Sequence, residues 1–177
     1  MSERQQIAKA DALATEWHQG ELRKYSLEPY IEHPRAVAAI IRSVPQHSWE
    51  LIAAALLHDV LEVPEPARSF RIQVIRDELG EVVLQFVLEV SNPSRLEDGN
   101  RKVRKAIDRA HLAKASPGGQ TLRLADALHN LHNLNNLSPT FAKLYAGEKQ
   151  LILPLTLAGD PTLHSRVSMI IEDILFS

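Results

Sequence analysis

Apolar residues recur along most of this chain with the period of an α-helix. In Met1–Gln19 they form a stripe repeating about every 3.6 residues, and Gly20 is a plausible stop. The valines of Glu81–Val90 could suggest a strand, but their spacing follows the helical period. Glycine is scarce and several prolines stand where helices would start, so the pattern predicts an all-α chain of about nine helices.

Proline, serine and glycine mark the predicted helix ends. Pro34 suits the first turn of a helix, Ser48 can cap the next one, and Gly80 follows the apolar stripe of another. Further helices are predicted at the following ranges: Leu51–Glu62, Phe70–Leu79, Asn100–Ala115, Thr121–Leu134, Pro139 to about Leu157, and Pro161–Phe176 capped by Asp160. Residues 91–100 read as a loop and 116–119 as a break. Because there is no internal repeat or linker, we expect one domain over residues 1–177.

The run Leu51–Glu62, LIAAALLHDVLE, combines strong helix formers with polar residues at its end. Burying His58 and Asp59 there is costly unless they are paired or bound to a cation. Taken alone, the HD dipeptide is better explained by a core histidine that is hydrogen-bonded to a neighbour. His58 and Glu62 stand four residues apart in the last turns of this helix, so we expect them to share one face.

Two other stretches favour the metal interpretation. Tyr30–Pro34 places His33 at a predicted helix start, and Leu122–Asn130 carries Asp126 and Asn130 four residues apart on one face. With His58 and Asp59 they supply two imidazoles and two carboxylates, a donor set suited to Mn, Fe or Zn. Such an ion lowers the pKa of bound water from about 15.7 toward about 7 and polarises a phosphoryl group.

This H…HD…D pattern resembles the HD-domain metal-dependent phosphohydrolases. The stretches YIEHPRAVA, IAAALLHDVLE and NRKVRKAIDRAHLAKASPGGQTLRLADALHNL are similar to the (p)ppGpp hydrolase domain of RelA/SpoT proteins and to small single-domain alarmone hydrolases, over Arg23 to about Tyr145. The resemblance implies a helical HD-domain bundle and removal of the 3′-pyrophosphate from guanosine tetra- or pentaphosphate. It also implies a divalent ion, usually Mn²⁺, with Fe²⁺, Zn²⁺ and Mg²⁺ as alternatives.

The resemblance also implies roles for single residues. The metal ligands would be His33, His58, Asp59 and Asp126, with Asp59 also in the catalytic set. Glu62 matches the first carboxylate of the family's HDxxED and would handle protons, while Asn130 matches the Asn after LAD. Arg23 and Lys24 match the RK before the HP motif, and Tyr145 matches a tyrosine near the nucleotide. From residue chemistry, Arg104 and Lys105 of the basic helix are either a solvated face or further phosphate contacts.

The chain departs from the family at Val63, where the pattern has its second acidic residue. Valine cannot help to activate water, and Glu65 lies beyond a proline. Three outcomes stay open: slower alarmone hydrolysis, a different nucleotide or nucleoside monophosphate as substrate, or a nucleotide-binding regulatory module without turnover. Ala127 and Leu128 also replace the commoner basic residue after LAD.

Composition excludes several other classes. The chain has 177 residues, 45% of them hydrophobic, and a formal net charge of −2, so charge gives no case for nucleic acid or membrane partners. There is no cysteine, no apolar run of about 18–20 residues and no signal-peptide core. We therefore expect a cytoplasmic protein, and the resemblance implies a nucleotide substrate as its principal partner. Exposed apolar helix faces would permit a homo-oligomer.

Overall fold

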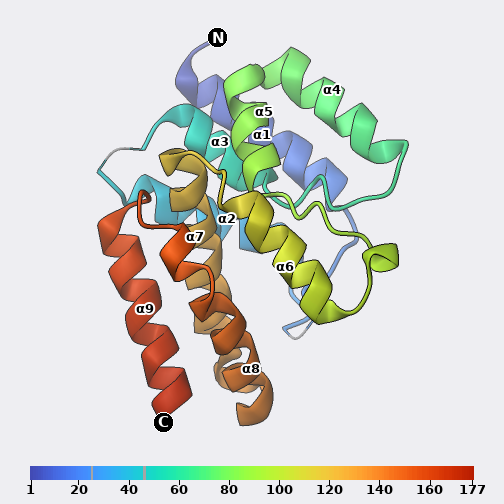
Figure 1. Ribbon diagram of the computed structural model, residues 1–177. Helices are drawn as coiled ribbons and strands as arrows, with labels where there is room; N and C mark the ends of the chain where they lie inside the picture. Colours follow the sequence, from blue (N-terminus) through green and yellow to red (C-terminus); the bar gives the residue numbers. More distant parts are fainter. Residues whose placement is uncertain (25, 46) are drawn as a thin grey trace. The chain divides into compact units, whose positions relative to one another are not determined.

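The computed structural model describes residues 1–24, 26–45 and 47–177, without the side chains of Asn135 and Asn136. Over these residues the protein is all-α, as the hydrophobic period predicts: nine α-helices, three short 3-10 helices and no strand (Figure 1). The chain forms two compact units, Met1–Ser91 (unit 1) and Asn92–Ser177 (unit 2), which are described separately. Whether residues 1–177 act as one domain stays a prediction. No helix of the described residues is long and apolar enough to cross a lipid bilayer.

Unit 1 runs from blue to green in Figure 1 and is built around α3. Its helices are α1 (Glu3–Trp17), α2 (Glu32–Arg42), α3 (Trp49–Leu57), α4 (Ala67–Leu79) and α5 (Glu81–Val90). Helix α3 packs against α1, α2 and α5, and α4 packs against α5. Every residue from Leu51 to Leu57 is buried, because neighbours cover α3 on all sides. The predicted Ser48 cap is confirmed: its Oγ accepts a hydrogen bond from the Leu51 N–H at 3.2 Å.

Helix α3 ends earlier than the sequence predicts. It stops at Leu57, and residues 58–61 form turns, so the predicted helix to Glu62 is wrong at its end. The His58 Nδ1 lies 2.8 Å from the Ala55 carbonyl oxygen, which in a continuing helix would accept from the Asp59 N–H. The side chain thus competes with the backbone. Because of this end, His58 and Glu62 do not share a helix face.

The segment between α1 and α2 is irregular, as expected, but it is held by specific hydrogen bonds. The Tyr30 N–H donates to the Glu21 carbonyl at 2.9 Å, and Leu22 and Pro29 form an isolated antiparallel bridge. Helix α2 then begins at Glu32, with Pro34 in its first turn as predicted. His33 and Pro34 are both buried there, so His33 points away from solvent.

Unit 2 runs from yellow-green to red in Figure 1. Its helices are α6 (Arg101–Leu112), α7 (Pro117–His132), α8 (Pro139–Gln150) and α9 (Pro161–Phe176), with α9 packed against α7 and α8. Three of them begin with a capping Ser or Asp followed by Pro at the first helical position: Ser116, Ser138 and Asp160. The predicted break at 116–119 is therefore wrong. Ser116 caps α7, and residues 117–119 form its first turn.

Candidate metal centre and anion pocket

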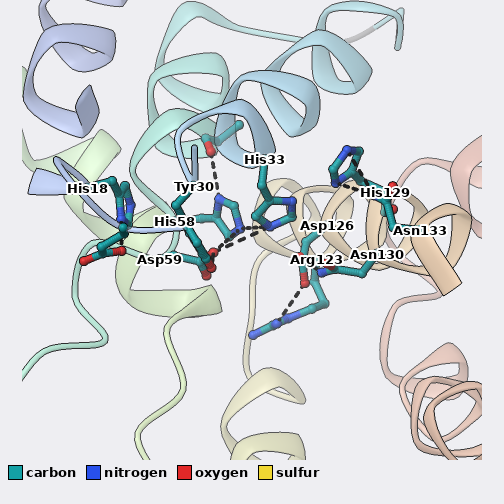
Figure 2. Close-up of polar contacts among 12 residues, drawn as sticks. His18, Tyr30, His33, His58, Asp59, Arg123, Asp126, His129, Asn130 and Asn133 are labelled. Atoms are coloured by element: carbon teal, nitrogen blue, oxygen red, sulfur yellow. Dashed lines mark hydrogen bonds and ion pairs between the residues drawn. The ribbon is translucent and has the colours of Figure 1, made fainter. Parts of the chain in front are cut away.

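Three side chains of unit 1 bring their metal-binding atoms together. The Nε2 atoms of His33 and His58 lie 3.2 Å apart. The Asp59 Oδ2 lies 3.5 Å from the His33 Nε2 and 3.2 Å from the His58 Nε2 (Figure 2). The two imidazoles are almost fully buried, at 1% and 3% exposure, while the Asp59 side chain keeps 18%. The cluster is therefore enclosed on the protein side and reaches solvent through Asp59.

The local backbone sets which nitrogen of His58 is available. A carbonyl oxygen only accepts, so the His58 Nδ1 must donate its hydrogen to Ala55. In a neutral imidazole this leaves the Nε2 with a lone pair directed at His33 and Asp59. A hydrogen bond from the other ring nitrogen to a carbonyl is the arrangement that orients histidine ligands around metals.

The separations of the three atoms suit a bound cation. Adjacent ligands about 2.1 Å from one ion, at angles of roughly 90–110°, are about 3.0–3.4 Å apart. The observed separations are 3.2, 3.2 and 3.5 Å. Two imidazole nitrogens and a carboxylate oxygen match the borderline ions among the first-row metals. The residues of unit 1 therefore fit a divalent ion.

Tyr30 connects the predicted phosphate-binding Arg23 to this cluster. The Tyr30 hydroxyl donates to the Asp59 Oδ2 at 2.7 Å, and the Arg23 guanidinium carbon lies 5.7 Å from the centre of the Tyr30 ring. Lys24, by contrast, is exposed in the turn that follows Arg23. Sequence reasoning gave Tyr30 no role. Only its position three residues before His33 could have suggested one.

The acidic residues after the HD pair lie outside the enclosed part of unit 1. Glu62 is exposed, and its N–H donates to the Asp59 carbonyl at 3.0 Å. Val63 is half-buried. The Glu65 carboxylate accepts from the Ser69 N–H at 3.0 Å, in the first turn of α4. Glu65 therefore stabilises the start of a helix.

In unit 2, Asp126 is buried among polar partners (Figure 2). The Asn130 amide donates to its Oδ1, which confirms that the two residues share a helix face. The Arg123 Nη1 lies 3.3 Å from its Oδ2, and the Lys149 Nζ lies 3.6 Å from the same oxygen. A buried carboxylate with two cationic neighbours is well compensated electrostatically.

Unit 2 also contains a pocket, lined by side chains of α6, α7 and α8. Five of its lining side chains are cationic: Arg101, Lys105, Arg109, Arg123 and Lys149. Asp108, Glu148 and Tyr145 line it as well. Since the cations outnumber the carboxylates, the pocket suits an anionic ligand such as a phosphate.

Some of these cations already have partners. Arg101 binds the Glu148 carboxylate through two hydrogen bonds of 2.6 and 2.7 Å, and the Lys105 Nζ lies 3.6 Å from Asp108. Arg109 is different. Within the described residues no hydrogen bond or ion pair involves its side chain, so its guanidinium is available for a bidentate phosphate contact.

Tyr145 and Lys149 form one wall of this pocket. The Lys149 Nζ lies 5.3 Å from the centre of the Tyr145 ring. Burial tends to lower the pKa of Lys149, but Tyr145 and Asp126 raise it, and the net shift is upward. Burial raises the pKa of Tyr145. At neutral pH the wall therefore presents an ammonium ion and a neutral phenol.

The basic helix α6 divides its charges between two faces. Lys105 lines the pocket, whereas Arg104 is not part of the lining. Adjacent helical positions point in different directions, so a neighbouring pair rarely serves one ligand. Arg101, Lys105 and Arg109 recur every four residues, and this spacing could have identified the pocket face from the sequence. Arg123 and Lys149 come from other helices and carry no such signal.

Comparisons with known proteins agree with this chemistry. The family model described as "HD domain" matches residues 10–153. This chain therefore belongs to the HD domain family, and membership implies a divalent metal ion. It is 32% identical to the mouse guanosine-3′,5′-bis(diphosphate) 3′-pyrophosphohydrolase MESH1 over 141 residues, 78% of this chain and 75% of that protein.

Longer relatives contain the same region. The chain is 32% identical to the GTP pyrophosphokinase of Streptomyces coelicolor, over 75% of this chain and 15% of that protein. It is 32% identical to the bifunctional (p)ppGpp synthase/hydrolase SpoT of Escherichia coli K12, over 80% of this chain and 20% of that protein. The chain thus spans a minor part of these relatives.

Solved structures share the fold. One is described as a metazoan ortholog of SpoT that hydrolyses ppGpp, with a TM-score of 0.81, 21% identity and coverage of 95% of this chain and 94% of that one. A second, lmo0812 of Listeria monocytogenes, has a TM-score of 0.58 and 20% identity over 82% of this chain and 99% of that one. At these identities the likeness shows the fold alone.

Proposed function

We propose that this protein is a metal-dependent hydrolase that removes pyrophosphate from the 3′ position of guanosine 3′,5′-bis(diphosphate). One observation carries the proposal: the donor atoms of the H…HD motif lie within 3.5 Å of one another in unit 1. The match to MESH1 over about three quarters of both chains supports the same substrate. The resemblance favours Mn²⁺ over Fe²⁺, Zn²⁺ and Mg²⁺ as the ion.

In this proposal the ion is held by His33, His58, Asp59 and Asp126. The first three belong to unit 1, and Asp126 of unit 2 supplies a second carboxylate of the kind that the family pattern requires. When bound, the ion lowers the pKa of a coordinated water and polarises a phosphoryl oxygen. Glu62 is exposed beside Asp59 and takes up or delivers protons there.

The remaining groups bind the nucleotide. Arg23 lies over the ring of Tyr30, whose hydroxyl donates to Asp59, and Lys24 lies in the following turn. The cationic pocket of unit 2 receives phosphate oxygens through Lys105 and Arg109, beside the neutral Tyr145 phenol. Asn130 holds Asp126, and Arg104 contributes positive charge from the other face of α6.

The direct test is incubation of the purified protein with Mn²⁺ and ppGpp, followed by chromatography of the products. We expect GDP and pyrophosphate, and we expect neither from Asp59→Ala, which loses the carboxylate shared by both imidazoles. Orthophosphate in place of pyrophosphate would mean that the protein removes single phosphates, as a phosphatase does, and not the 3′-pyrophosphate. Metal binding without any product would overturn the hydrolase proposal.

Replacing Arg109 tests the anion pocket. Arg109→Ala should raise the KM for ppGpp by about 10–100-fold with little change in kcat, because a charge-assisted contact is worth about 1.5–3 kcal/mol. Lys102→Ala is the matched control: it removes a cation of α6 that is exposed and does not line the pocket. Equal KM values for the two variants would show that the phosphates of the substrate do not bind at Arg109.

A second candidate function is nucleotide binding without turnover. The observation that favours it is Val63 together with the engagement of Glu65 at the start of α4, which leaves the second acidic position of the family pattern unfilled. It predicts a nucleotide that binds tightly and is recovered unchanged at saturating Mn²⁺. The incubation described above separates this candidate from slow hydrolysis.

A further inference from the structure

Asp59 is not part of a helix, so helical backbone geometry does not restrict its side chain. It lies in the turns after α3, one residue beyond the cap His58. The bond between its Cβ atom and its carboxylate joins a tetrahedral carbon to a planar group, and rotation about such a bond has a broad energy profile. The direction of the Oδ2 toward the two imidazoles must therefore be set by a side-chain partner.

In unit 1, Tyr30 is a side-chain partner of this kind. Its hydroxyl lies 2.7 Å from the Asp59 Oδ2, the same oxygen that lies 3.2 and 3.5 Å from His58 and His33 (Figure 2). A phenol donates one hydrogen, and an oxygen that accepts it keeps a further lone pair for a cation. The contact thus orients the carboxylate without occupying all of its acceptor capacity.

The Tyr30 ring is itself held from several sides. The centre of the His18 ring lies 4.8 Å from it, and the His33 ring meets it edge-on at 5.9 Å with an interplanar angle of 80°. His18 is buried, and its Nδ1 lies 2.8 Å from the Glu21 Oε2. The Glu21 carbonyl in turn accepts from the Tyr30 N–H. The position of the hydroxyl is therefore fixed by contacts other than Asp59.

We propose that Tyr30 is a positioning residue that holds the Asp59 Oδ2 in place for the divalent ion, and that His18 and Glu21 hold Tyr30. This inference rests on the proposed metal centre. It assigns the segment between α1 and α2 a part in metal affinity, although none of its residues is a metal ligand in the proposal.

The test is Mn²⁺ binding to metal-stripped protein without nucleotide, measured from the electron paramagnetic resonance signal of free Mn²⁺. Tyr30→Phe should weaken binding by about 10–100-fold, as for other partners of metal ligands. Activity should fall at limiting Mn²⁺ and recover within a few-fold at saturating Mn²⁺, with the KM for ppGpp unchanged. A merely structural defect would not be rescued by the metal. Ser168→Ala removes a hydroxyl from α9 of unit 2, outside the proposed site, and should leave Mn²⁺ affinity unchanged.

A second variant covers the case in which Tyr30→Phe does not fold. Glu21→Gln keeps a half-exposed side chain of the same size, weakens the contact to His18, and should reduce Mn²⁺ affinity by a few-fold. If Tyr30→Phe binds Mn²⁺ as tightly as the wild type, the inference is overturned and the proposed function stays intact. If Tyr30→Phe does not fold, the same outcome in Glu21→Gln overturns the inference. If the wild-type protein binds no Mn²⁺, the proposed metal centre fails and the inference with it. If binding depends on Tyr30 but ppGpp survives, only the substrate is wrong.

Discussion

Asp126→Asn should lower the affinity for Mn²⁺ by more than about 100-fold, because removing a ligand costs more than removing its partner. Hydrolysis of ppGpp should fall by about 10³-fold or more at physiological metal, since water at an empty centre keeps its ordinary acidity. The measurements are Mn²⁺ titration of metal-stripped protein and initial rates of pyrophosphate release.

This substitution is informative because it changes charge while nearly preserving shape. Asparagine can still accept from the Asn130 amide through its one carbonyl oxygen, while its NH2 group takes the place of the Oδ2 that faces Arg123 and Lys149, so the side chain keeps its shape and one of its hydrogen bonds. Asp173→Asn is the matched control, since Asp173 is exposed on α9. Asp126→Asn protein that binds Mn²⁺ like the wild type would show that Asp126 only balances Arg123 and Lys149.

The helices could be predicted from the sequence because the apolar period is a local property. Helix α5 has the predicted bounds Glu81–Val90, and the Gly80 stop and the Ser48 cap are confirmed. The end of α3 could not be predicted in the same way. It depends on the His58 side chain, which binds the Ala55 carbonyl in place of the backbone. The start of α7 differs from the prediction because Pro and Gly together favour a break, although Pro after a Ser cap begins a helix.

The same distinction between local and long-range features applies to the candidate site. The donor types of the H…HD…D pattern can be identified from residue chemistry, and the resemblance adds their roles. The groups around these donors cannot be identified in this way, because their contacts join residues that are distant in the sequence. Tyr30, for example, donates a hydrogen bond to Asp59, 29 positions away. Neither hydrophobic period nor residue spacing encodes such a contact. Arg109 lies between these two cases. Its spacing of four residues from Lys105 can be seen in the sequence, but the structure is needed to show that no described residue binds its side chain.

Val63→Asp should raise kcat for ppGpp hydrolysis by about 100-fold, the lower part of the range for general acid–base groups. Position 63 follows the exposed Glu62 and is half-buried, so a carboxylate there would be close to Asp59 along the chain and partly shielded from solvent. Glu65 stays at the start of α4 in this variant, because its bond to the Ser69 N–H does not involve residue 63. The new carboxylate would fill the second acidic position of the family pattern.

The matched variant is Val63→Asn, which has the size and polarity of aspartate without its charge or basicity. If position 63 acts through proton transfer, only the aspartate accelerates hydrolysis. Its advantage should disappear as the pH falls through the ordinary pKa of an aspartate, about 3.9, because only the ionised form accepts a proton. Equal rates for the two variants would mean that Glu62 already performs this transfer, and that the valine limits neither the chemistry nor the substrate.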